Sequence, residues 1–213
     1  MTRAMSPSTV SRRGALLRVV AALVGAGAAV GAVWALLAPP IQGVVALTRS
    51  GDRVKAAMGS DADLWFTSAA LFVGMMSVLA VVAAVAAWQW RAHRGPAMIG
   101  ALSAGAVAAT AVGAGVGAAV ARLRYGTIDV AAAPVTEEHR FHYIVEAPSV
   151  FFAHTPLDVA LTLLMPAAVI AVVYVLAAVS TPRDDLGAWP PVDYPVVLTD
   201  RIATGADVPP SVP

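Results

Sequence analysis

The chain has 213 residues, of which 59% are hydrophobic and 13% are charged, and its formal net charge is +1. Soluble domains contain about 45 to 50% apolar and about 25% charged residues, so this composition predicts a membrane protein. The small net charge and the lack of a dense basic cluster argue against nucleic acid as a partner. Because the chain has no cysteine, disulfides, iron–sulfur clusters and thiolate catalysis are excluded.

The apolar runs predict an all-α integral membrane protein with four transmembrane helices in a bundle. We expect a polar N-terminal segment at residues 1–14, the transmembrane domain at 15–180 and a Pro-rich tail at 181–213. The four spans are expected at about residues 15–38, 64–90, 98–121 and 156–180. Each run is long enough, at ~1.5 Å per residue, to cross a hydrocarbon core of ~30 Å.

The first span follows a short arginine-containing string. Residues 11–17 (SRRGALL) are similar to a twin-arginine export signal, but they lack the usual phenylalanine. The apolar run is also longer than a typical signal h-region, so we expect a retained anchor.

The third span contains a row of small residues at every fourth position. Residues four apart lie on one face of a helix, and such small-residue rows let two helices approach closely in lipid. The row consists of Ala101, Gly105, Ala109, Gly113, Gly117 and Ala121. Gly27, Gly31 and Ala35 form a second row in the first span. We therefore predict Gly27, Gly31, Gly105, Gly113 and Gly117 as helix-packing residues. A dinucleotide fingerprint at Gly113, Gly115 and Gly117 is the alternative, but no strand precedes these glycines and they lie in a membrane span, so packing is preferred.

Tryptophans mark both ends of the second span. Trp65 lies near its start, and Trp88 and Trp90 lie at its end. Indole rings are enriched at membrane–water interfaces, so we predict these three residues as interface anchors.

Two longer loops separate the spans, at residues 41–63 and about 122–154. In the second loop, residues 125–130 and 141–145 are short β-capable runs that predict a small hairpin. Segments below ~40 residues rarely fold unaided. We expect this loop to be stabilised by packing against the first loop, the membrane surface or another protein.

Basic residues near the span ends predict the orientation. One side has Arg12, Arg13, Arg18, Arg91, Arg94 and Arg183, and the other has Arg49, Arg53, Lys55, Arg122 and Arg124. The positive-inside rule favours a multi-pass protein of the plasma membrane with both termini cytoplasmic and both longer loops outside.

The sequence predicts no catalytic, cofactor-binding or metal site. The interiors of the spans contain no ionisable residue, which removes the usual basis for a proton relay or an intramembrane protease. One loop cluster has metal-binding residue types, but its spacing matches no known ligand pattern, so a solvated loop is the preferred interpretation. The cluster consists of Glu137, Glu138, His139, His142, Glu146, His154 and Asp158.

Four segments of the sequence resemble those of a known protein family. They are residues 11–17, 38–43 (APPIQG), 146–155 (EAPSVFFAHT) and 182–194 (PRDDLGAWPPVDY). The chain is similar to the small, Ala/Val-rich four-helix membrane proteins of unknown function from mycobacteria and related actinobacteria. The resemblance implies a four-helix fold and no assigned activity, so no catalytic residue is carried over.

We expect a non-catalytic accessory or structural subunit that packs through small-residue helix faces into a larger membrane or envelope complex. Its partners would be the lipid bilayer and other membrane subunits, or further copies of itself. The alternative is a small transporter or lipid-handling protein acting as a homo-oligomer, with Thr110, Thr162, Pro166 and Tyr174 as its polar or kinked features. An enzyme comes third, and it would need the loop histidines and carboxylates to converge.

Overall fold

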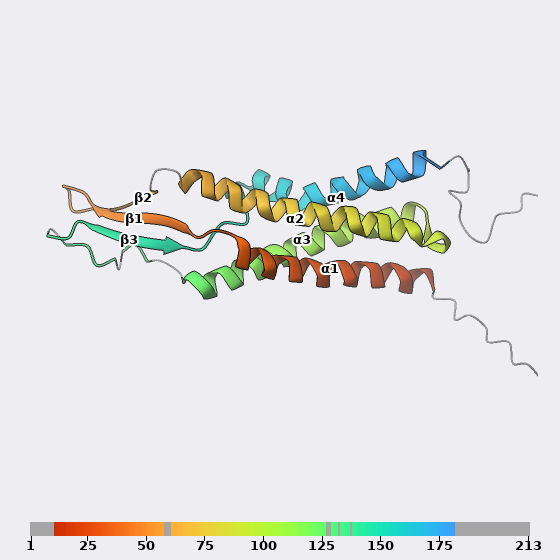
Figure 1. Cartoon of the computed structure of the whole chain (residues 1–213), viewed down its shortest axis with the longest axis horizontal. Helices are drawn as coiled ribbons and strands as arrows, with labels where there is room; N and C mark the ends of the chain where they lie inside the picture. The colour runs from red at the N-terminus through yellow and green to blue at the C-terminus, as the bar shows by residue number, and fades with distance from the viewer. Residues whose placement is uncertain (1–10, 58–60, 127–128, 132, 137, 182–213) are drawn as a thin grey trace, which may run out of the picture.

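The chain forms a bundle of four long helices with a small sheet at one end. The computed structural model describes residues 11–57, 61–126, 129–131, 133–136 and 138–181. In this part of the chain, α1 covers Arg12–Leu37, α2 Asp61–Gln89, α3 Pro96–Tyr125 and α4 Pro156–Val179. All four helices lie along one axis (Figure 1). Each is long and apolar enough to cross a membrane, which confirms the predicted fold class.

Local capping sets where two of the helices begin. α1 begins at Arg12, earlier than the predicted start at residue 15, because the Ser11 hydroxyl accepts a hydrogen bond from the Gly14 amide at 3.2 Å. The Thr155 hydroxyl accepts one from the Asp158 amide at 3.3 Å and opens α4. Side chains at these positions satisfy amides that have no partner inside the helix.

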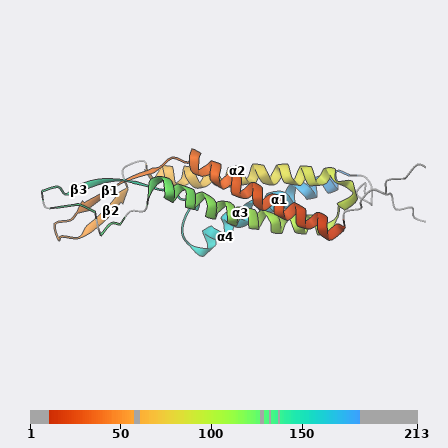
Figure 2. The ribbon, with the colours of Figure 1, turned by 90° about the horizontal axis from the view of Figure 1, so that it is seen from below.

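The helices form two parallel pairs that run in opposite directions. α1 and α3 run toward the sheet and share the most extensive helix contact, while α2 and α4 run away from it and pack together (Figures 1 and 2). A tight turn with a short 3₁₀ helix, Arg91–His93, joins α2 to α3. Arg12 and Val179 therefore lie at the same end of the bundle, opposite the sheet. The predicted segment 1–14 and tail 181–213 fall mostly outside the described residues.

The bundle core contains large side chains from all four helices. Its largest fully buried members include Trp34 of α1, Phe72 and Met76 of α2, Met98 and Leu102 of α3, and Ile170 of α4. The outward faces also carry large apolar side chains, as lipid-facing helices require.

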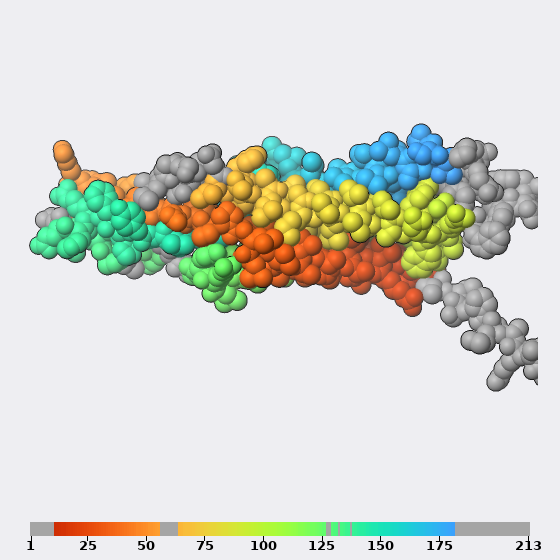
Figure 3. Space-filling view, in the orientation of Figure 1, coloured from red at the N-terminus to blue at the C-terminus, as the bar shows by residue number. Residues whose placement is uncertain are grey.

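Three antiparallel strands form the sheet, in the order β2-β1-β3. β1 covers Ile41–Leu47, β2 Arg53–Ala57 and β3 Phe141–Glu146. β1 pairs with β2 across a short turn, and it pairs with β3 from Ile41 opposite Glu146 to Ala46 opposite Phe141. The sheet extends the long axis of the bundle as a lobe at one end (Figure 3).

The predicted hairpin differs from the observed sheet. The β-capable run 141–145 does form a strand, but its partner is β1 and not the run 125–130, because Tyr125 belongs to α3. The first loop, which has no predicted strand, supplies both β1 and β2. The second loop therefore packs against the first loop through this strand pairing, which is one of the three expected contacts.

Candidate functional site

The two glycine rows face each other along the parallel pair of helices α1 and α3. A Cβ atom added at Gly27 would overlap Ala109, and one added at Gly31 would overlap the backbone of Gly113. A Cβ added at Gly113 would lie 2.6 Å from the Gly27 carbonyl oxygen. These backbones are too close for any side chain, so the contact requires glycine.

The remaining predicted glycines receive side chains from α1. A Cβ at Gly105 would lie 2.9 Å from Leu23 Cδ1, and one at Gly117 would lie 2.9 Å from Trp34 Cε3. The structure thus brings all five predicted packing glycines into one seam between α1 and α3, which we call the glycine seam. The seam joins two helices of the same chain.

Of the three predicted tryptophan anchors, Trp65 lies near the start of α2, Trp88 near its end and Trp90 just beyond it. Trp65 is 38% exposed near the sheet. Trp88 and Trp90 are half-buried at the turn into α3, where the guanidinium carbon of Arg94 lies 4.4 Å from the centroid of the Trp88 ring. Trp88 also meets the ring of Tyr174 edge-on, with centroids 5.1 Å apart. The cluster around Trp88 is thus part of the packing between α2 and α4.

The loop residues with metal-binding side chains do not converge. Within the described ranges no group of three such residues could hold a metal ion, and Glu137 lies outside those ranges. Glu146 pairs with Lys55, and Asp158 caps α4 beside Thr155. His154 lines a pocket that Glu146 also borders.

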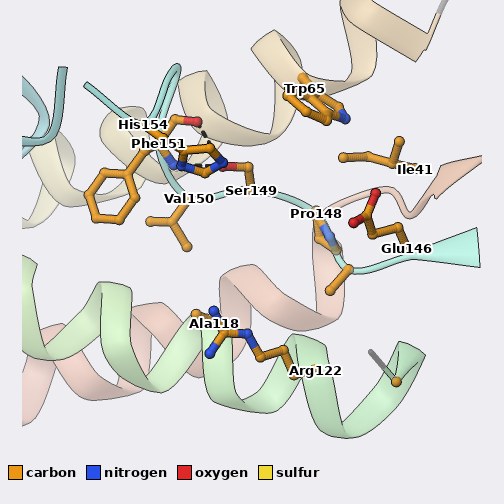
Figure 4. A pocket seen from close by; sticks show the side chains of 12 residues that line it. Ile41, Trp65, Ala118, Arg122, Glu146, Pro148, Ser149, Val150, Phe151 and His154 are labelled. Carbon is orange, nitrogen blue, oxygen red and sulfur yellow. Dashed lines mark hydrogen bonds between the residues drawn. The ribbon is translucent and has the colours of Figure 1, made fainter. Parts of the chain in front are cut away.

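That pocket, the junction pocket, lies where the bundle meets the sheet. Its volume is about 330 Å³, and its walls come from α2, α3, the start of β1 and the chain between β3 and α4. Figure 4 shows Trp65 on one side, with Ala118 and Arg122 on the opposite side. The wall between them includes Ile41, Glu146, Val150, Phe151 and His154. No sequence pattern predicts this pocket, because its walls come from segments far apart in the chain.

The sheet has one covered face and one open face. On the covered face, Val45 and Ile144 pack with Ala133 and Val135. The pairing register places a second set on the opposite side, which we call the open face. The open face contains Gln42, Val44, Ala46, Val54, Phe141, Tyr143 and Val145.

Apart from Gln42, the open face is apolar, and much of it is exposed. Phe141 is 68% exposed and Tyr143 72% exposed, and the valines beside them on both edge strands are also exposed. None of these seven residues is charged. The sequence predicts β3 but not this face, because the face forms only when β1 aligns the two edge strands.

Buried hydroxyls in the bundle bond to their own helices. Thr110 donates to the Ala106 carbonyl and Thr162 to the Asp158 carbonyl, each at 2.8 Å. The space beside Pro166 is too small to hold a water molecule. These hydroxyls are therefore satisfied without water or a ligand.

In the described part of the chain, the fold consists of four helices long and apolar enough to cross a membrane and a three-stranded sheet beyond one end of the bundle. The chain belongs to the family described as "Protein of unknown function (DUF2567)", whose model matches residues 23–188. The expected resemblance to mycobacterial proteins is thereby confirmed.

The relatives come from mycobacteria. The uncharacterised protein Rv1591 of Mycobacterium tuberculosis is 50% identical over 168 residues, which cover 78% of this chain and 87% of that protein. The uncharacterised protein ML1222 of Mycobacterium leprae is 44% identical over 172 residues, which cover 81% of this chain and 87% of that protein. No solved structure matches the chain.

Proposed function

We propose that this protein is a non-catalytic accessory subunit of the plasma membrane whose sheet docks onto another membrane or envelope protein. The observation that carries the proposal is the open face, with Phe141 and Tyr143 more than two-thirds exposed. Contiguous exposed apolar patches mark interaction sites in proteins. Because the open face has no charged residue, its partner presents an apolar, uncharged surface.

The geometry of the sheet favours a protein over the bilayer as this partner. The strands continue the axis of the helices (Figure 1), so helices that span a membrane hold the strands upright above it. β1 has seven residues, and a strand rises about 3.3 Å per residue, so the sheet stands roughly 20 Å high. Phe141 pairs with Ala46 near the end of β1 that is remote from the bundle.

The helix faces support a lipid environment for the bundle itself. The glycine seam is occupied by contacts between α1 and α3, so its glycines are not free for another subunit. The outward side chains are larger, such as Val82 of α2 and Leu161 and Val175 of α4. These outward side chains suit contact with acyl chains. The sheet is therefore the proposed site of contact with a partner protein.

Basic residues lie at both ends of the bundle. Arg12, Arg13, Arg18, Arg91 and Arg94 lie at or near the end away from the sheet, and Arg122, Arg124 and Lys55 lie toward the sheet. The proposed orientation, with the sheet outside, therefore follows the prediction from the sequence, in which six basic residues including Arg183 are set against five.

Transport or lipid handling through the bundle is the less favoured function. The hydroxyls of Thr110 and Thr162 donate to their own helices, and the space beside Pro166 admits no water. Tyr174 accepts a 3.1 Å hydrogen bond from the Gly95 amide. Each of these features has a packing role, which supports a scaffold over a pathway.

The proposal is tested by replacing the exposed aromatic residues. In the double variant Phe141→Ser/Tyr143→Ser, we expect loss of a stoichiometric partner that co-purifies with the wild type after gentle detergent extraction. Arg49→Ser is the control, because Arg49 is exposed at the turn between β1 and β2 and lies outside the open face. Mass spectrometry identifies the partner and distinguishes a foreign subunit from a second copy. Equal recovery of the same partner by the double variant and the control would contradict the proposal.

A further inference from the structure

The junction pocket contains a guanidinium that no described residue neutralises. Arg122 lies in the last turn of α3, and in the described part of the chain its guanidinium makes no hydrogen bond or ion pair. Arg124, two residues later, donates instead to the Leu36 carbonyl at 3.1 Å and lies over the ring of Tyr125. Arg122 is therefore the basic residue of this turn that remains available to a ligand.

The Glu146 carboxylate does not neutralise the positive charge of Arg122. Glu146 lines the same pocket, but its carboxylate pairs with Lys55 on the neighbouring edge of the sheet. The pair is close to neutral, so the charge of Arg122 sets the sign of the pocket. An anion is consequently favoured over a cation.

The donors present suit an oxyanion. A guanidinium offers a planar fork of N–H groups that matches the oxygens of a phosphate. His154 lines the same pocket and adds an imidazole N–H, which is present in the neutral and the charged form. The Ser149 hydroxyl is already occupied, because it donates to the Phe151 carbonyl at 2.8 Å.

Part of the wall is apolar or aromatic. Trp65 lies across the pocket from Arg122, and Ile41, Val150 and Phe151 also line it (Figure 4). A volume of about 330 Å³ is at the lower end of the range for small-ligand sites. Such a pocket fits a molecule that has one anionic group beside an apolar part.

We infer that the junction pocket binds the phosphate of an amphipathic molecule. The phosphate lies on Arg122 and His154, and the adjoining apolar part lies along Trp65 and Phe151. The pocket lies at the end of the apolar helices, at the level where lipid headgroups meet tryptophan and arginine side chains. A phospholipid headgroup and a soluble phosphate ester carry the same group, so the experiment separates these two sources.

The test compares two arginines of the same helix turn. Wild type, Arg122→Gln, Arg122→Lys and Arg124→Gln are purified in detergent. Native mass spectrometry measures retained phosphatidylglycerol, and calorimetry measures binding of glycerol phosphate. Arg122→Gln and Arg124→Gln remove the same charge from the same helix end, so they differ in whether the lost group lines the pocket. Melting temperatures show that each variant is folded.

We expect the wild type to bind at least one of the two probes. The affinity for that probe should fall about 10-fold in Arg122→Gln, the size expected for one lost charge-assisted hydrogen bond. Arg122→Lys keeps the charge but loses the planar set of N–H groups, so its affinity lies between those of Arg122→Gln and the wild type. Arg124→Gln binds the probe as the wild type does. Dependence on Arg122 for phosphatidylglycerol identifies a lipid headgroup, and the same dependence for glycerol phosphate alone identifies a soluble ester. Equal binding by both glutamine variants, or binding of neither probe by the folded wild type, would overturn the inference. The pocket shares no residue with the open face, so this result is independent of the docking experiment.

Discussion

The indole Nε1 of Trp34 donates a 2.8 Å hydrogen bond to the backbone carbonyl of Ser68, which ties α1 to α2. Both side chains are fully buried. The same indole ring meets Phe72 edge-on, with centroids 5.7 Å apart, and it covers Gly117 of α3. One tryptophan thus holds three helices together near the sheet end of the bundle.

Replacing Trp34 is expected to destabilise the bundle in two steps. Trp34→Phe removes the hydrogen bond, which contributes about 1 kcal/mol, and Trp34→Ala also opens a cavity, at a total cost of about 3 to 5 kcal/mol. Unfolding of the purified protein in detergent, followed by circular dichroism, measures both losses. Leu37→Ala is the control on the same helix, because Leu37 is 61% exposed. A loss for Leu37→Ala as large as that for Trp34→Ala would contradict the assignment.

The glycine seam predicts opposite outcomes for two glycines of α1. Gly31→Ala places a Cβ against the backbone of Gly113, and forcing the helices apart costs about 1 to 3 kcal/mol or more. A Cβ at Gly25 meets no atom within 4 Å, so Gly25→Ala is neutral or slightly stabilising, since alanine favours helix by about 1 kcal/mol over glycine. Melting temperatures in one detergent compare the two variants directly. If both variants melt at the same temperature, the seam is not the close contact described.

Leucine substitutions in the glycine seam are expected to disrupt folding of the single chain. Gly113→Leu and Gly117→Leu should disrupt the pairing of α1 with α3 within one chain, before any assembly with a partner. Size-exclusion chromatography distinguishes the two effects, because a folding defect broadens the monomer peak whereas an assembly defect leaves a sharp one. Sharp, wild-type monomer peaks for both variants would contradict a seam within the chain.

Tyr174 is expected to stabilise the turn between α2 and α3. Its hydroxyl accepts a hydrogen bond from the buried amide of Gly95, which has φ +136° and is the N-cap residue of α3. Tyr174→Phe leaves this amide without its partner, at a cost of about 1 to 3 kcal/mol. Tyr143→Phe removes a hydroxyl from a residue that is 72% exposed and should change nothing. Thermal unfolding of the two variants checks the difference, and equal stabilities would refute the role of Tyr174.

Neighbouring residues of β3 are expected to differ sharply in their effect on the sheet. Ile144 is 7% exposed on the covered face, so Ile144→Ser removes buried apolar surface and should cost at least the 2 to 5 kcal/mol typical of isoleucine truncation. Tyr143→Ser on the open face should leave the sheet intact. Hydrogen exchange of the β1 amides reports on this sheet alone. Faster exchange in Tyr143→Ser than in Ile144→Ser would show that the two faces have been assigned the wrong way round.

The helices are predictable from the sequence because their signals are local. Apolar runs set the number of spans, and the spacing of four between Gly27 and Gly31 and between Gly113 and Gly117 indicates a packing face. The partner of that face follows less directly, because the same spacing suits another subunit as well as another helix of the chain. The structure places the two rows against each other.

The sheet and the pocket depend on contacts that are distant in sequence. Ile41 pairs with Glu146, and no local pattern in the first loop indicates that partner. The junction pocket likewise needs Trp65 and Arg122 to meet across the end of the bundle. Trp34 lies near a helix end, where tryptophan suits a membrane interface, and only its contacts with α2 and α3 place it in the core.

Photo-crosslinking in native membranes shows whether a partner protein contacts the open face. A photoreactive amino acid replaces Tyr143 on the open face or, as a control, Val172, which is 58% exposed on the outside of α4. We expect a discrete protein adduct from position 143 and only lipid adducts from position 172. A discrete protein adduct from position 172, with none from position 143, would show that partners bind the helices and not the sheet.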